Sequence, residues 1–229
     1  MPRRVVITGM GVLSPIGNSI PEFNVNLKNG VNGIAPITHF DTSNYNVHIA
    51  GEVKFDLETA IDKKELNRMD RFTAMAIIAS DEAIKQAKIN NSSLNKDRIG
   101  VIIGSGIGGI TTFEKQHEKL LKNPKRVSPF FIPSMISDIA SGQVSIKYGL
   151  RGPNYSVVSA CATASHAIGD ALRMISCDDA DVIITGGSDA TISPMAVAGF
   201  SNMKALTKNS NPKEASRPFD ANRDGFVMG

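Results

Sequence analysis

Three short apolar runs, each ending in glycine, constrain the fold of this chain more than any other feature of its sequence. They are Val5–Gly9, Val101–Gly104 and Val182–Gly187, and valine and isoleucine dominate all three. Continuous β-branched runs of this length are typical of strands that are buried on both faces. We therefore expect three strands of a covered sheet.

A helical pattern lies between the first two of these runs. Apolar side chains recur there at spacings of three and four, and charged residues fall outside the stripe. The stripe consists of Phe72, Met75, Ala76, Ala79, Ala83 and Ala87. This alternation of strands and helices predicts an α/β protein with a mixed or parallel sheet and helices on its faces.

A second helical segment, from Ala160 to Ser176, is unusual because small residues occur on every side of its first half. Its apolar stripe contains Ala164, Ala167, Ile168, Ala171, Leu172 and Ile175. A helix with so few large side chains can be approached closely from several directions. We interpret it as a helix buried between two sheets, and an alanine-rich surface helix is the alternative.

Composition excludes several classes of protein. The 229 residues include 25 basic and 22 acidic side chains, and this balance argues against a nucleic-acid partner. Two cysteines and four scattered histidines make neither a disulfide framework nor a zinc site, so we expect no metal. No apolar run approaches the roughly 20 residues needed to span a bilayer, and the chain start lacks a signal-peptide core. We expect a soluble, cytoplasmic protein without a membrane partner.

Cys161 is the candidate nucleophile. It follows a strand-like run, residues 154–160, and opens the small-residue helix. Backbone N–H groups at a helix start carry partial positive charge, which favours thiolate over thiol. The same groups could stabilise an oxyanion on a thioester that the sulfur attacks. A buried structural cysteine is the alternative. Cys177, before two aspartates at the far end of the helix, is interpreted as structural.

None of the four histidines has an evident catalytic setting. His166 is the nearest to Cys161 in sequence, but five residues at about 100° each place the two roughly 140° apart around a helix. We therefore assign His166 a structural or supporting role. His39 and His48 fall in a loop-rich stretch, and His117 falls on a charged helix. The chain alone offers Cys161 no good general base.

The segment Gly104–Gly109 matches the glycine-rich fingerprint of dinucleotide sites, after a strand and before a helix. Such a site also needs an acidic residue about 20 positions further on, at the end of a strand. Residues 125–133 supply none. The glycines more plausibly let the loop approach a substrate or a second subunit closely.

Taken together, these motifs resemble those of the β-ketoacyl-[acyl-carrier-protein] synthases, in particular the amino-terminal half of the type II enzymes. The similarity spans the whole chain. The matching segments are 5–11 with 14–17, 104–109, 128–133, 152–154, 159–161, 186–187, 216–220 and 223–226. Any one of them alone would be unspecific, whereas together they are highly specific.

The resemblance implies a thiolase-like fold, in which two similar halves form an α-β-α-β-α layered sandwich. Residues 1–229 would be the first half, and the carboxyl-terminal half would be absent from this sequence. The chain ends directly after Arg223–Gly229, which resembles the start of another ordered element. We therefore expect a continuation.

The implied activity is that of a 3-oxoacyl-[acyl-carrier-protein] synthase of fatty-acid elongation, an acyltransferase that needs no cofactor. Cys161 would take the acyl group from acyl carrier protein as a thioester. Malonyl carrier protein would then undergo a decarboxylating Claisen condensation with it, and covalent capture divides one difficult step into two easier ones.

Further residues carry over from the resemblance by position. Ile107 and Phe200 would line the acyl pocket, and Phe131 and Ile132 would reach the pocket of a neighbouring subunit in a homodimer. For each of these, plain core packing is the alternative. Basic residues near the pocket mouth would steer the acidic acyl carrier protein, although each taken singly could be a solvated surface residue. The candidates are Lys63, Lys64, Arg68, Arg71, Lys125, Arg126 and Lys204.

The family's two catalytic histidines and one of its oxyanion-hole amides come from the second half and do not occur in this sequence. We therefore expect the 229-residue segment alone to be inactive in condensation and to expose a large apolar face. Three alternatives stay open. They are a polyketide ketosynthase, a thiolase acting on coenzyme A substrates, and a non-catalytic acyl-binding or partner subunit. The compact chain start favours the fatty-acid enzyme over the polyketide enzyme.

Overall fold

The computed structural model describes residues 3–89 and 93–229, which divide into two compact units. The first unit contains residues 1–11 and 56–190, and the second contains residues 12–55 and 191–229. Within the described ranges, no helix combines the length and apolar character that crossing a membrane requires.

A parallel sheet forms the centre of the first unit. β3 (Ile99–Gly104) lies between β4 (Asn154–Tyr155) and β5 (Val182–Gly187), and it pairs in register with β5 along its whole length. All six residues of β3 are buried, as its apolar run predicts. β5 is only partly buried, because it is an edge strand of the sheet that the described residues form.

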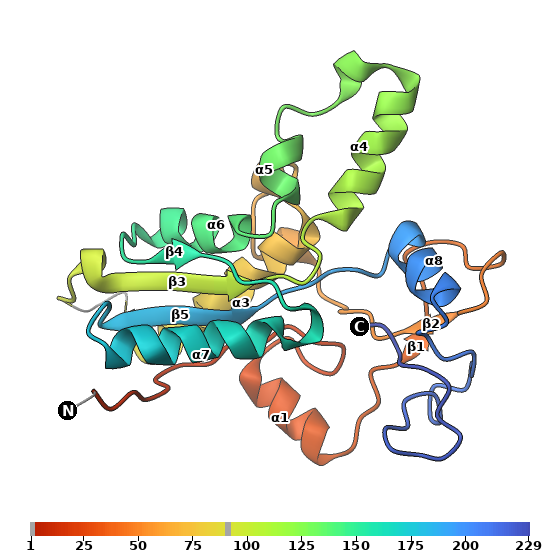
Figure 1. Cartoon of the computed structure of the whole chain (residues 1–229), viewed down its shortest axis with the longest axis horizontal. Helices are drawn as coiled ribbons and strands as arrows, with labels where there is room; N and C mark the ends of the chain where they lie inside the picture. Colours follow the sequence, from red (N-terminus) through yellow and green to blue (C-terminus); the bar gives the residue numbers. More distant parts are fainter. Residues whose placement is uncertain (1–2, 90–92) are drawn as a thin grey trace. The chain divides into compact units, whose positions relative to one another are not determined.

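Helices cover both faces of this sheet (Figure 1). α3 (Arg71–Ala87) and α6 (Ile139–Tyr148) lie on one face, and α7 (Thr163–Ser176) lies on the other. Val101 and Ile103 of β3 belong to the same buried cluster as Phe72 of α3 and Val144 of α6. The α/β class predicted from the sequence is therefore confirmed.

α3 matches the predicted helix, with one shift in its buried stripe. The Asp70 side chain caps its amino end by accepting a hydrogen bond from the Phe72 amide. Of the predicted stripe, Phe72, Met75 and Ala76 are buried, whereas the three later alanines are half-buried. Ile77 and Ile84, which the stripe omitted, complete the buried face.

The first apolar run, in contrast, is not a strand. Residues 3–11 have no regular structure, and Val6 and Ile7 are 60% and 81% exposed. The prediction is wrong because a strand needs a paired neighbour, and no described strand pairs with this run. The chain instead crosses α3 so closely that a Cβ atom at Gly9 would lie 2.1 Å from the Ala83 carbonyl oxygen.

α7 is covered on one face only. Thr163, Ala167 and Ala171 are buried, whereas Ile168 and Leu172 are 51% and 53% exposed. The described part of the chain places one sheet against α7, so the second sheet of the interpreted arrangement stays a prediction. The small residues do permit close approach on the covered face, as the site geometry below shows.

The remaining elements of the first unit are short, apart from α4 (Ile110–Lys122), which follows the glycine-rich loop. α5 (Phe131–Met135) lies beside α4 (Figure 1). The others are η1 (Leu57–Thr59), α2 (Lys63–Leu66), η3 (Lys96–Arg98), η4 (Pro124–Arg126) and η5 (Ala160–Ala162).

The second unit contains α1 (Ile20–Lys28), α8 (Pro194–Asn202) and the antiparallel pair β1 (Ala35–Pro36) and β2 (Ile49–Ala50). Glu52 is buried there and accepts hydrogen bonds from the Thr38 amide and hydroxyl and from the His39 amide. The chain end is ordered, since Leu206 and Phe226 form a parallel bridge.

Candidate active site

Cys161 lies in the 3-10 turn η5, directly before α7, and is exposed. The preceding residue, Ala160, has a φ of 51°, a left-handed conformation that turns the chain sharply. The Thr163 hydroxyl accepts a hydrogen bond of 2.8 Å from the Ser159 amide and closes this turn. The predicted position of Cys161 at the start of the small-residue helix is therefore correct.

Two glycines at strand ends let this turn lie against the sheet. A Cβ atom at Gly104, the last residue of β3, would lie 2.2 Å from Cγ2 of Thr163. One at Gly187, the last residue of β5, would lie 2.8 Å from Cβ of Ala164. The Cys161 turn thus sits at the carboxyl ends of parallel strands, where open α/β sheets place their ligand sites.

The amino end of α7 adjoins Cys161. The residue at the N-cap position, Ala162, has no polar side chain and so forms no capping hydrogen bond. The first turn of α7 therefore presents backbone N–H groups without a side-chain cap, and such groups carry partial positive charge. Cys177 follows the last residue of α7 at the opposite, negative pole and is exposed, so it lies outside the buried core of the described residues.

The His166 side chain contacts the segment that precedes the nucleophile. Its Nδ1 atom lies 2.6 Å from the Ser159 hydroxyl oxygen, a hydrogen bond that ties the first turns of α7 to the segment before Cys161. In the described residues, no hydrogen bond or ion pair reaches the Cys161 sulfur. The His166 side chain thus helps to hold the turn that carries Cys161.

The glycine-rich loop between β3 and α4 binds a carboxylate of this chain. The amides of Gly106 and Ile107 donate to Asp189, at 3.1 Å and 3.3 Å. These are the kind of backbone groups that hold phosphate in a dinucleotide site. Because Asp189 already occupies them, the structure supports the rejection of a nucleotide site.

The residues expected to contact acyl chains lie in three places. Ile107 is in the glycine-rich loop and is 39% exposed. Phe131 and Ile132 begin α5, where Phe131 is half-buried and Ile132 is 55% exposed. Phe200 belongs to α8 of the second unit, where its ring packs edge-on against Phe226 at 5.7 Å.

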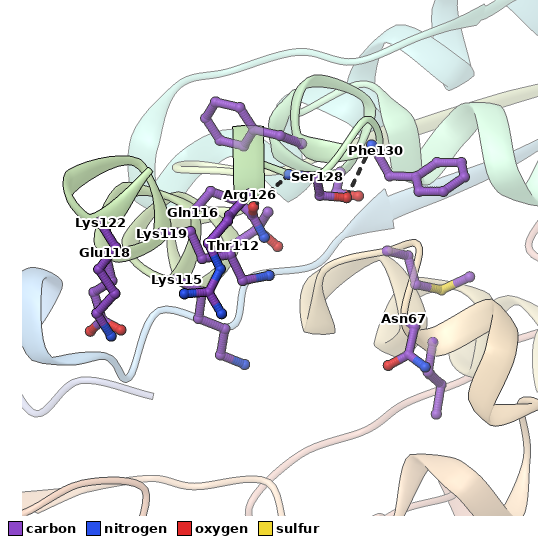
Figure 2. Close-up of a pocket in the computed structure, with 14 residues that line it drawn as sticks. Asn67, Thr112, Lys115, Gln116, Glu118, Lys119, Lys122, Arg126, Ser128 and Phe130 are labelled. Carbon is purple, nitrogen blue, oxygen red and sulfur yellow. Dashed lines mark hydrogen bonds between the residues drawn. The ribbon is translucent and has the colours of Figure 1, made fainter. Parts of the chain in front are cut away.

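A cavity of about 490 Å³ lies among α4, η4 and the residues around α2. Lys115, Lys119, Lys122 and Arg126 line it, and Glu118 is the one acid among its lining residues. Figure 2 shows these cationic groups gathered on the α4 side, with Asn67 on the opposite wall. A cavity with this charge is suited to an anionic ligand or protein surface.

Of the predicted carrier-protein contacts, Arg126 lines this cavity, and Arg68 stacks on Phe130, another lining residue, at 5.1 Å. Arg71 lines a smaller neighbouring cavity of about 270 Å³. Lys63 pairs with Glu58 at 3.4 Å, Lys64 and Lys125 are exposed, and Lys204 lies in the second unit.

Sequence reasoning missed the three lysines of α4. Their signal is present, since Lys115, Lys119 and Lys122 follow one another at spacings of four and three and so share a helix face. Cys161 lines neither cavity, and the described residues contain no cluster of three or more potential metal ligands.

Comparison with known proteins places this geometry in context. Residues 2–229 match the family model described as "Beta-ketoacyl synthase, N-terminal domain". The 3-oxoacyl-[acyl-carrier-protein] synthase 2 of Staphylococcus aureus (strain COL) is 55% identical, and the match covers 99% of this chain and 55% of that protein. Its counterpart from Synechocystis sp. is 50% identical, with the same coverage. The chain thus spans about half the length of the curated relatives it matches.

Solved structures agree. A ketosynthase of a type II polyketide synthase, in complex with its acyl-carrier protein and bound to the hexaketide, superposes with a TM-score of 0.87 at 27% identity; the match covers all of this chain and 56% of that one. A β-ketoacyl synthase from Burkholderia phymatum STM815 gives 0.82 at 28% identity, covering 99% and 56%. The predicted thiolase-like α/β fold class is confirmed by these likenesses.

Proposed function

Because this chain belongs to the β-ketoacyl synthase family and matches its N-terminal domain, we propose that it is the nucleophile-bearing part of a 3-oxoacyl-[acyl-carrier-protein] synthase of fatty-acid elongation. The observation that carries the proposal is the position of Cys161, exposed at the amino end of α7. That position suits a thiolate that attacks a thioester.

The first step is acyl capture. The Cys161 thiolate attacks the carbonyl carbon of an acyl group that is bound as a thioester to acyl carrier protein. The tetrahedral oxyanion then collapses, the bond to the carrier sulfur breaks, and that sulfur leaves as a thiolate and takes up a proton. Amide groups at the start of α7 would stabilise the oxyanion during attack.

The second step is condensation. Malonyl carrier protein loses carbon dioxide, and the resulting carbanion attacks the acyl-Cys161 thioester. The bond to the sulfur of Cys161 breaks, which regenerates the thiolate and gives a 3-oxoacyl carrier protein that is two carbons longer. The decarboxylating histidines that the resemblance implies are not in this sequence, so this step needs groups outside these 229 residues.

The basic cavity of the first unit supports docking of acyl carrier protein in both its acyl and malonyl forms. Lysine and arginine side chains there would steer an acidic partner and raise its association rate. The contacts first proposed were Lys63, Lys64, Arg68, Arg71, Lys125, Arg126 and Lys204, and we add the three cavity-lining lysines of α4 to this set.

The acyl pocket and the homodimer also stay within the proposal. Ile107 and Phe200 would form pocket walls, and Phe131 and Ile132 would reach the partner's pocket. The exposure of Ile132 (55%) and Ile136 (40%) at α5 supports an apolar contact with a second subunit. The cytoplasmic location expected from the sequence stays a prediction.

A polyketide ketosynthase is the second candidate. A solved ketosynthase of a type II polyketide synthase superposes well, but at 27% identity, whereas the 3-oxoacyl synthases share 50–55%. This difference favours the fatty-acid enzyme. A non-catalytic partner subunit is disfavoured by the exposed thiol at the amino end of α7.

Acyl transfer from a carrier protein tests the proposal directly. The intact gene product is incubated with a saturated acyl carrier-protein thioester, digested and analysed by mass spectrometry. We expect one acyl adduct, on Cys161, and its conversion to 3-oxoacyl carrier protein when malonyl carrier protein is added. Acyl-coenzyme A serves as a competing donor, and preferential loading from it would indicate a thiolase instead.

Cys177 provides an internal control because it is exposed at the other end of the same helix. Cys161→Ser should abolish loading, and Cys177→Ser should leave it unchanged. A wild-type protein that acquires no adduct on Cys161 would overturn the proposal in favour of a binding subunit.

A further inference from the structure

Asp189, two residues beyond β5, binds three successive groups of the glycine-rich loop. Its Oδ1 atom accepts from the Ser105 hydroxyl at 2.8 Å, and both of its oxygens lie 3.1 Å from the Gly106 amide. The Ile107 amide adds a bond of 3.3 Å. Hydrogen bonds to an ionised carboxylate are stronger than neutral ones, so this side chain fixes the loop.

The hydroxyl of Ser105 extends this network inside the protein. Ser105 is fully buried, and its oxygen accepts from the Gly108 amide at 2.9 Å while the hydroxyl donates to Asp189. The loop is therefore held at every residue from 105 to 108. Its conformation depends on one carboxylate that arrives from the end of another strand.

The fixed loop lies against the turn that carries Cys161. A Cβ atom added at Gly106 would lie 3.5 Å from the carbonyl oxygen of Ala160 and 3.4 Å from Oδ2 of Asp189. Gly106 thus fills the space between the carboxylate and the residue that precedes the nucleophile. Ile107 follows at once, with 39% of its surface exposed.

We propose that Asp189 is a positioning residue for acyl transfer, which holds the glycine-rich loop beside the Cys161 turn so that Ile107 keeps its place as a wall for the acyl chain. The inference rests on the proposed function, because it assigns a role within that reaction. Asp189 acts through the loop and does not touch the acyl group. Its effect must therefore grow with acyl chain length, because a short acyl group does not extend along the wall.

The test uses the intact gene product and three variants. Asp189→Asn removes the charge and turns two donor hydrogens toward loop amides, and Asp189→Glu retains a carboxylate. Asp97→Asn is the matched control, because Asp97 is an exposed aspartate of the same unit that pairs with Arg151. Loading of Cys161 from a short and from a long acyl carrier-protein thioester is measured beside alkylation of Cys161 by iodoacetamide.

We expect Asp189→Asn to slow long-chain loading by about tenfold, the effect of losing one strong interaction, and to slow short-chain loading and alkylation by less than about twofold. Asp189→Glu should recover most of the long-chain rate, and Asp97→Asn should match wild type. Amide hydrogen exchange should become faster at residues 106–108 in Asp189→Asn alone.

Two results would overturn the inference while the proposed function stands. In the first, the wild-type protein loads both donors, and Asp189→Asn loads the short and the long donor as fast as the wild type does. The other is an equal loss for short donor, long donor and alkylation in both Asp189 variants, which indicates a general loss of structure. A wild-type protein that loads neither donor would instead refute the proposed function, and the inference with it.

Discussion

Glu52 shows at the residue scale how this chain stabilises a buried carboxylate. Its side chain is 4% exposed, and it accepts three hydrogen bonds from Thr38 and His39. Burial acts to raise the pKa of Glu52, but these bonds and the nearby His39 outweigh burial and leave the pKa below its ordinary value. The ionised form is therefore the one that stabilises the second unit.

The substitution Glu52→Gln should destabilise this region by about 1–3 kcal/mol, because an amide N–H2 group would face N–H donors. The measurement is hydrogen exchange of the Thr38 and His39 amides, which should become at least about tenfold faster. An unchanged exchange rate would contradict this account. Glu58→Gln is the control, since Glu58 is 54% exposed and pairs only across the surface with Lys63.

The same residue predicts a pH dependence with a definite sign. Because the folded-state pKa of Glu52 is lowered, its contribution is fully present above the unfolded-state pKa of about 4.3. It is lost as pH falls through the lower folded-state pKa. Protection of the Thr38 and His39 amides should therefore decline in acid for wild type and show no such decline in Glu52→Gln.

Residue-scale prediction from the sequence succeeded where the relevant groups are close in the chain. The position of Cys161 before a helix follows from local spacing, and the structure has it. The role of Asp189 could not be found in this way. It lies 84 positions from Ser105, and only the register of β5 beside β3 brings the two together.

At the scale of single elements, the packing of α7 depends on glycine at the end of β3. Gly104→Ala would place a methyl group 2.2 Å from Cγ2 of Thr163 and 2.9 Å from the Val157 carbonyl oxygen, so both α7 and the segment before Cys161 would have to shift. We expect a loss of about 1–3 kcal/mol in unfolding free energy, together with slower acyl loading of Cys161.

Gly169→Ala is the matched variant, because it adds a methyl group to the same helix where nothing lies within 4 Å. It should raise the unfolding free energy by up to about 1 kcal/mol, the difference in helix propensity. Urea unfolding of both variants checks the pair. Equal unfolding free energies of the two variants would show that the close contacts at Gly104 do not restrict the residue at that position to glycine.

Element prediction failed where a strand had to be identified without its partner. β3 and β5 were found from their β-branched runs, but residues 5–9 have the same character and are not a strand in the structure. Side-chain type indicates that a segment suits a sheet, whereas pairing depends on which backbone lies next to it. The same lack of a neighbour leaves β5 partly exposed.

At the scale of the whole molecule, the sequence-based expectation of two similar halves stays a prediction. The described residues contain a sheet of three strands and a separate pair, and they match about half of each curated relative. The fold class followed from the family's motifs. What covers the exposed face of α7 could not follow, because that depends on groups that no pattern in these residues specifies.

The exposed apolar residues of the first unit lead to a prediction for the 229-residue chain expressed by itself. The largest exposures are at Ile7 (81%), Leu121 (74%), Ile146 (73%), Val158 (61%) and Val6 (60%), and on α7 Leu172 and Ile168 are 53% and 51% exposed. Exposed apolar side chains promote aggregation in water when they are grouped. Ile168 and Leu172 are grouped in this way, because a spacing of four places them on one face of α7. The chain should therefore bind the dye ANS, self-associate in analytical ultracentrifugation and show no condensing activity.

The double variant Ile168→Lys, Leu172→Lys should lower dye binding and association while its circular dichroism stays unchanged, because neither side chain contributes to the buried face of α7. A monomeric chain that binds no dye and forms 3-oxoacyl products would refute the prediction, since it would show that these residues alone bury their apolar surface and supply every group that condensation requires.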